Sequence, residues 1–227
     1  MTLLITILPS IVLVLYFIKS DKFKEPNRII IITFLFGILI TIPAGYLNSL
    51  IDKNFATGER FNDALLSGFF GGGPVEELLK FSILYFYILK EKAFNEPMDG
   101  LVYGILASLG FATLENLQYV FYFDSEFWSA QEIAIFRSYS AIPLHGLCGT
   151  IMGFYFGQYA FSANKKYLGL AIIVPIIFHG SYNFMCDYNW YYAVSIVAVG
   201  FIFALLLHRN LKLLQKEKKK EHEEKKV

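Results

Sequence analysis

Long apolar stretches separated by short polar connections dominate the chain. A helix needs about 20 mainly apolar residues to cross the hydrocarbon core of a bilayer. Seven stretches come near this length, and we expect a membrane-spanning helix in each: 2–18, 29–51, 64–89, 98–123, 138–161, 167–185 and 190–208. The pattern predicts an all-α, polytopic transmembrane helix bundle, with residues 1–208 forming a single domain.

The third stretch contains Gly71-Gly72-Gly73-Pro74, a run that weakens a helix. A break at membrane depth is tolerated where it lines a cavity or is buried in protein. Two explanations stay open at this point, a simple kink and a break that lines a functional cavity.

The distribution of charge predicts an orientation for these spans. Only 17% of the residues are charged, against about 25% in soluble domains, and many of them lie in 210–227. If the N-terminus is outside, sixteen of the twenty Lys and Arg residues fall on the inner side and Lys80 lies within a span. The three on the outer side are Lys53, Arg60 and Arg137. Inner loops are enriched in Lys and Arg, so we expect an N-out, C-in topology with a charged cytoplasmic tail at 209–227.

Other features of the composition exclude some functions or predict helix packing. The net charge of +1 gives no indication of nucleic-acid binding, and two cysteines suit neither a disulfide framework nor a zinc finger. The first span has no basic residue before it and no cleavage site after it, so we expect it to be retained. Small residues at a spacing of four predict close helix packing; they are Gly100, Gly104 and Ser108, and Gly149, Gly153 and Gly157.

Ionisable side chains within the spans are the strongest functional signal, because they are costly in a bilayer. At about 1.5 Å per residue, Glu76, Glu115 and His179 lie about 20, 26 and 18 Å above the inner face. His145 lies about 10 Å below the outer face by the same estimate. All four fall in the outer half of the membrane, and scattered structural residues would have no reason to agree in depth.

The local spacing of these residues indicates acid–base chemistry. Glu76 and Lys80 are four residues apart and share a helix face, so they can pair. Two adjacent carboxylates cannot both ionise cheaply in a low dielectric, which is what a general acid–base pair requires. His179 and Asn183 also share a face and could hold a water or an oxyanion. The predicted site comprises Glu76, Glu77, Lys80, Glu115, His145, His179 and Asn183.

Several short motifs follow one another in a specific order along the chain. They are Pro74-Val75-Glu76-Glu77-Leu78-Leu79-Lys80, Asp99-Gly100-Leu101-Val102-Tyr103-Gly104, Gly110-Phe111-Ala112-Thr113-Leu114-Glu115, Arg137 and Pro143 before His145, and His179-Gly180-Ser181-Tyr182-Asn183. Over residues 60–190 this series resembles the PrsW family of bacterial intramembrane proteases, related to the group that contains the CAAX prenyl endopeptidases. That family's motif usually begins with three acidic residues, and Val75 stands at the first of these positions. Asn183, in place of Asp, is closer to the prenyl endopeptidase pattern.

The resemblance implies a multi-pass protein of the bacterial cell membrane that cuts a membrane-protein substrate near its outer side. The implied substrate is a single-span protein such as an anti-sigma factor, and the implied base is Glu76 or Glu77. The relatives include enzymes viewed as metal-free and others called metalloproteases. We favour a metal-free mechanism, with zinc as the alternative; its candidate ligands are Glu76, Glu77, His145 and His179.

Two other classes of function fit some of these features. Intramembrane carboxylates, histidines and a broken helix also describe a proton-coupled transporter. The outer depth of the polar groups and the lack of an inverted repeat argue against that reading. A non-catalytic membrane scaffold that retains the fold is the third hypothesis.

Overall fold

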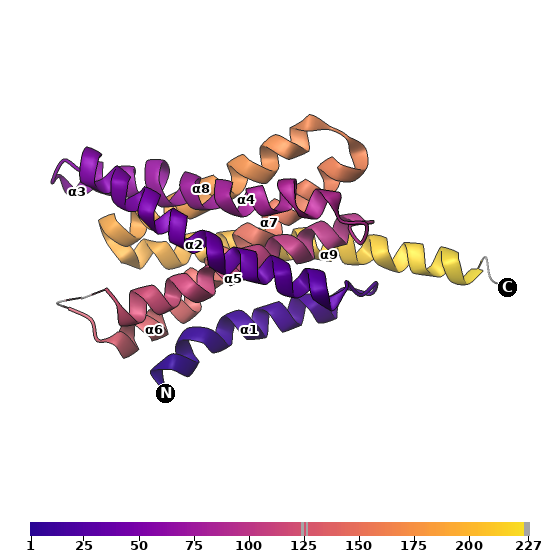
Figure 1. Cartoon of the computed structure of the whole chain (residues 1–227), viewed down its shortest axis with the longest axis horizontal. Helices are drawn as coiled ribbons and strands as arrows, with labels where there is room; N and C mark the ends of the chain where they lie inside the picture. Colours follow the sequence, from indigo (N-terminus) through magenta and orange to yellow (C-terminus); the bar gives the residue numbers. More distant parts are fainter. Residues whose placement is uncertain (124, 126, 225–227) are drawn as a thin grey trace.

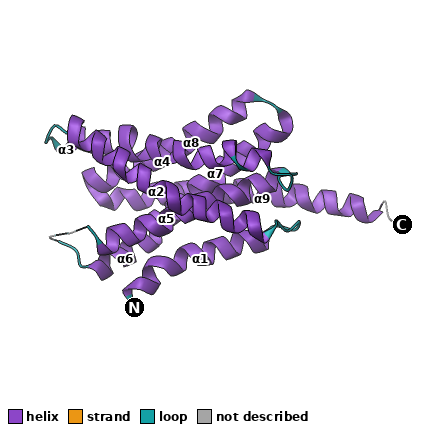
Figure 2. Ribbon diagram, in the orientation of Figure 1, coloured by secondary structure: helices purple, strands orange, loops and turns teal. Residues whose placement is uncertain are grey.

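The computed structural model describes residues 1–123, 125 and 127–224, with side chains described as far as Glu217. This part of the chain is an elongated bundle of α-helices without strands (Figures 1 and 2). The helices are α1 (Thr2–Ser20), α2 (Asn27–Phe55), α3 (Arg60–Leu66), α4 (Gly73–Phe86), α5 (Pro97–Phe121), α6 (Ala130–Tyr139), α7 (Ala141–Ser162), α8 (Lys165–Asn189) and α9 (Ala193–Glu224). The predicted all-α class is therefore confirmed.

Four runs in the described part are long and apolar enough to cross a membrane. They are α1, α2, α5 and the run from Lys165 to Glu217, which contains α8 and most of α9. The count of seven spans and the N-out, C-in orientation stay predictions. So does the division into a domain at 1–208 and a tail at 209–227, although α9 continues as one helix to Glu224.

The connections that follow α2, α5 and α8 lie at the same end of the bundle. At one end, Arg60 donates to the backbone carbonyl of Asp187 at 3.2 Å, and the rings of Trp128 and Trp190 lie 5.6 Å apart. The N-terminus lies toward this end in Figure 1, and the C-terminus lies at the other. This arrangement agrees with helices that run alternately up and down.

The third predicted span, 64–89, is not one helix. It consists of α3, a π-helical turn from Ser67 to Gly72, and α4. Within the turn, Gly71 has a non-helical backbone, with φ −93° and ψ −110°. Close packing on α8 explains Gly73, because a Cβ there would lie 3.0 Å from the backbone of Gly180. The structure therefore agrees with the second explanation of the glycine run, since Gly71 and Gly72 line a cavity.

The fifth predicted span, 138–161, is also interrupted. Helix α6 ends at Tyr139, Ser140 has φ −119° and ψ −71°, and α7 begins at Ala141. Pro143 explains the break, because proline has no N–H and its ring clashes with the carbonyl four residues earlier. The short helix α6 can therefore turn toward α5 instead of continuing the axis of α7.

Helices α5 and α7 form the centre of the bundle. Almost every side chain of α5 from Met98 to Ala112 is buried. The two predicted stripes of small residues meet here, since a Cβ at Gly104 would lie 2.5 Å from the carbonyl oxygen of Gly149. Such contacts allow two backbones to approach closely without a hydrophobic driving force.

Adding one methyl group to this interface tests the packing. A Cβ at Gly153 would lie 2.2 Å from the carbonyl oxygen of Gly100. We expect Gly153→Ala to lower the free energy of unfolding by about 1–3 kcal/mol because the helices must separate. The measurement is thermal unfolding of the detergent-solubilised protein.

Gly169→Ala on α8 is the matched control, because its Cβ would meet nothing within 4 Å. Alanine favours a helix over glycine by up to about 1 kcal/mol, so this variant should not be destabilised. Equal unfolding midpoints for Gly153→Ala and the wild type would contradict the close approach of α5 and α7.

Candidate active site

A buried ammonium group lies at the centre of the polar cluster. Lys80 has no exposed surface, and its Nζ lies 2.8 Å from Oε1 of Glu77 and 3.5 Å from Oε2 of Glu76. It also lies 2.9 Å from Nδ1 of His145 and 4.2 Å from the centre of the Phe111 ring. The first turns of α4 place both glutamates within reach of Lys80, because they are three and four residues away. One lysine therefore neutralises charge from both carboxylates.

Two histidines from α7 and α8 complete the inner part of the cluster. Nδ1 of His179 lies 2.7 Å from Oε1 of Glu77, and its Nε2 lies 3.6 Å from Oε2 of Glu76. The imidazole rings of His145 and His179 meet edge to face at 5.0 Å. Since Lys80 has no acceptor, Nδ1 of His145 accepts its hydrogen bond, and Nε2 of His145 carries the proton toward Glu115.

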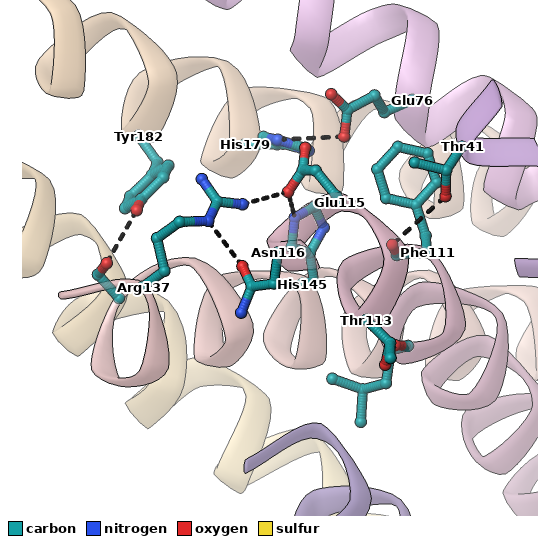
Figure 3. A network of polar contacts seen from close by, with 12 residues as sticks. Thr41, Glu76, Phe111, Thr113, Glu115, Asn116, Arg137, His145, His179 and Tyr182 are labelled. Atoms are coloured by element: carbon teal, nitrogen blue, oxygen red, sulfur yellow. Dashed lines mark hydrogen bonds and ion pairs between the residues drawn. The ribbon is translucent and has the colours of Figure 1, made fainter. Parts of the chain in front are cut away.

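The outer part of the cluster is built around Glu115 on α5. Its Oε2 lies 3.0 Å from Nε2 of His145 and 2.5 Å from Nη2 of Arg137 on α6. Arg137 also donates from Nε to Oδ1 of Asn116 at 2.6 Å and stacks on Tyr119 at 3.9 Å. Figure 3 shows Arg137 reaching from α6 toward Glu115 and Asn116. The break before α7 allows this contact, because it lets α6 bring the guanidinium over α5.

A polar cavity of about 100 Å³ opens beside these groups. Its lining includes Glu76, Glu115, His145, His179 and Asn183 but not Glu77. Around this space, Figure 3 shows Glu76 facing His179, with Glu115 and His145 close by. The two glutamates therefore differ in access: Glu76 faces the cavity, whereas Glu77 lies behind it with no exposed surface.

Two amide side chains lie beside the carboxylate of Glu76. Asn48 on α2 donates from Nδ2 to Oε1 of Glu76 at 3.3 Å. Asn183 on α8 lies beside Gly72, where a Cβ would come within 2.4 Å of its Nδ2. The same Cβ would lie 3.4 Å from Oε1 of Glu76, so the glycine leaves room for both side chains.

Comparison with known proteins agrees with this geometry. The family described as "PrsW family intramembrane metalloprotease" matches residues 25–208. "Protease PrsW" of Bacillus subtilis is 37% identical over 193 residues, which cover 82% of this chain and 84% of that protein. "Protease PrsW" of Clostridioides difficile is 32% identical over 223 residues, covering 95% and 92%.

The chain belongs to the PrsW family. The resemblance drawn from the motifs is confirmed, and the match is wider than the 60–190 region that carried it. Membership of this family supports a protease within a multi-pass membrane protein. No solved structure matches the chain.

The family description makes a metal plausible, and the donor set can be compared with a zinc site. One ligand atom each from Glu76, His145 and His179 lie within 4.8 Å of one another. Each histidine also contacts a carboxylate through its other nitrogen, as zinc-binding histidines commonly do. The donors therefore fit zinc in kind, but Lys80 competes for Nδ1 of His145.

The structure brings the predicted side chains of this PrsW-family chain to one place, although their catalytic roles stay predictions. Sequence reasoning missed the inward position of Arg137, which it counted as an outer loop charge. Pro143, six residues later, was the signal that a new helix starts there. Asn48 was also missed, because no spacing within α2 links it to the glutamates. Tyr119 was missed although it follows Glu115 by four residues and so shares its helix face.

A double-mutant cycle tests the contact between Arg137 and Glu115. Arg137→Gln leaves the carboxylate of Glu115 with only a histidine partner, and we expect it to cost about 3–5 kcal/mol of stability. Arg137→Gln combined with Glu115→Gln should cost less than Arg137→Gln alone, because no uncompensated charge remains. Thermal unfolding of the four proteins measures the coupling, and strictly additive effects would contradict the ion pair.

Proposed function

We propose that this chain is a glutamate-dependent endopeptidase that hydrolyses a peptide bond of a membrane-protein substrate near its outer side. The observation that carries this proposal is the unequal placement of the two glutamates. Glu76 lines the polar cavity, whereas Glu77 is fully buried between Lys80 and His179. A base must reach the water from which it takes a proton, and this requirement favours Glu76.

Glu77 is the positioning residue in this proposal. Its Oε1 contacts both Nζ of Lys80 and Nδ1 of His179. A carboxylate in this place fixes the orientation of the imidazole, as the aspartate of a catalytic triad does. It also keeps Lys80 charged and close to Glu76, so the two glutamates divide the roles of base and support.

The proposed reaction needs one water molecule and no other reactant. Glu76 takes a proton from water while the water oxygen attacks the carbonyl carbon of the scissile bond. The amide of Asn183 donates to the oxyanion that forms. Because Nδ1–H of His179 points to Glu77, its Nε2 accepts a hydrogen bond and can orient the attacking water. The protonated Glu76 then gives its proton to the leaving amine as the carbon–nitrogen bond breaks.

Zinc is the alternative source of an activated water in this site. Bound by Glu76, His145 and His179, it would lower the pKa of its water to near neutrality. The ammonium of Lys80 already supplies positive charge at 3.5 Å from Glu76 and 2.9 Å from His145. We therefore favour the metal-free form, and metal analysis of the purified protein distinguishes the two.

A wider groove adjoins the cavity and suits a substrate chain. It has a volume of about 360 Å³ and shares Tyr119, Arg137 and Asn183 with the cavity. Farther out it is lined by aromatic side chains, among them Trp128 and Trp190. An extended segment with bulky apolar residues could lie there with its backbone near Glu76. The outer juxtamembrane segment of a single-span protein, such as an anti-sigma factor, fits this description.

Comparative membrane proteomics tests the proposed base. Cells with the wild-type chain should contain a membrane protein that has lost its outer domain, and cells with Glu76→Gln should retain it intact. We expect Glu76→Gln to lower cleavage by about 100-fold or more, the usual effect of losing a general base. Its unfolding midpoint should stay near wild type, because the amide can keep the contact with Asn48.

Two further variants separate catalysis from folding. Glu77→Gln should lower both cleavage and the unfolding midpoint, because Lys80 loses its nearest charge partner. Glu59→Gln, an exposed carboxylate outside the cavity, should change neither. Full cleavage by Glu76→Gln would overturn the proposal, as would flux driven by a pH gradient in proteoliposomes without any proteolysis.

A further inference from the structure

A second cluster of carboxylates lies at the end of the bundle that holds the C-terminus. Asp21 follows α1, Glu25 lies in the connection to α2, and Asp99 lies in the first turn of α5. One carboxylate oxygen from each of the three lies within 4.8 Å of the other two. None of these residues lines the catalytic cavity, so the cluster is separate from the proposed protease site.

The two aspartates each have one oxygen engaged and one unpartnered. Oδ2 of Asp99 accepts from the backbone N–H groups of Asn95 and Glu96, at 2.8 and 2.9 Å. Oδ1 of Asp21 accepts from the backbone N–H of Phe23 at 3.0 Å and also from a glutamine of α9. Oδ1 of Asp99 and Oδ2 of Asp21 are buried and have no hydrogen-bond partner. Such atoms are costly to bury unless a ligand satisfies them.

Among the described residues, no Lys, Arg or His side chain forms an ion pair with the carboxylates of this cluster. The ammonium of Lys24 donates to the backbone carbonyl of Asp21 instead. In the part of the chain that the structure describes, all six ion pairs lie in the candidate active site. Glu25 accepts from the hydroxyl of Tyr103, which is neutral. Three carboxylates this close favour either shared protons or a bound cation.

We propose that Asp21, Glu25 and Asp99 bind a hard divalent cation, Mg²⁺ or Ca²⁺. The donors are oxygen atoms only, which both ions prefer and which disfavour zinc or copper. The three donor atoms lie within 4.8 Å of one another, so one Ca²⁺ ion could reach all of them at its usual oxygen distance of about 2.4 Å, and Mg²⁺ needs a slightly tighter set. Three carboxylates leave room for water to complete either coordination shell.

A cation here would fasten the connection between α1 and α2 to the start of α5. Both aspartates contribute an oxygen that is otherwise unpartnered, and their remaining oxygens fix the local backbone. Because α5 carries Glu115 in its other half, the cation would also hold the central helix of the bundle in place. Its effect on the protease site would be indirect and structural.

Thermal unfolding of the purified full-length chain in detergent, after chelation, tests this site. Addition of MgCl₂ or CaCl₂ should raise the unfolding midpoint saturably, by about 3–6 °C at ten times Kd. KCl at matched ionic strength controls for screening. Asp21→Asn and Asp99→Asn keep an oxygen for the existing hydrogen bonds and should abolish the rise. Without added cation these two variants should unfold at or above the wild-type midpoint, because repulsion is relieved.

Two variants make the result specific. Glu25→Gln, in the connection outside the helices, should weaken the cation effect without a folding defect. Glu76→Gln should leave it unchanged, because that residue belongs to the other cluster. The proposal is overturned if neither cation shifts the wild-type midpoint, if Asp21→Asn shifts as much as wild type, or if only Glu76→Gln removes the shift.

Discussion

The buried ammonium of Lys80 is the interaction on which the candidate site depends. It has no exposed surface and contacts two glutamates of its own helix and His145 of α7. Through Glu77 the same network reaches His179 on α8. A buried charge is tolerated only when such partners surround it. Helices α4, α7 and α8 must therefore pack so that their polar residues meet at Lys80.

The backbone breaks follow from the same constraint. The π-helical turn at Ser67–Gly72 places the first turn of α4, with both glutamates, beside α8. The interruption at Ser140 frees α6 to bring Arg137 onto Glu115. Residues at both breaks, Gly71, Gly72 and Ala141, line the same polar cavity, so the irregular backbone borders the candidate site.

Much of the candidate site was predictable from sequence because its residues are costly where they occur. Glutamates and histidines within apolar stretches stand out, and counting residues placed Glu76, Glu115 and His179 at similar depth. The glycine stripes likewise predicted the contact between α5 and α7. These signals depend on residue type and spacing within one helix.

What sequence could not give is the relation between helices. Whether Glu76 or Glu77 faces the cavity depends on the rotation of α4 about its own axis. Adjacent residues of a helix point about 100° apart, so the sequence alone fits either choice. The inward position of Arg137 depends on the helix break at Ser140. That break lies inside a continuous apolar stretch, so hydropathy alone does not reveal it. The oxygen cluster at Asp21 and Asp99 was equally hidden, since the capping contacts of Asp99 account for only half of its carboxylate.

The central claim is that Lys80 neutralises the paired glutamates and so holds the site together. The most direct measurement is the unfolding midpoint of Lys80→Met beside that of Lys80→Met with Glu77→Gln. Removing one partner of a buried ion pair costs about 3–5 kcal/mol, whereas neutralising both costs much less. The account predicts a large fall for the single variant and substantial recovery for the double variant. A wild-type midpoint for Lys80→Met alone would contradict it.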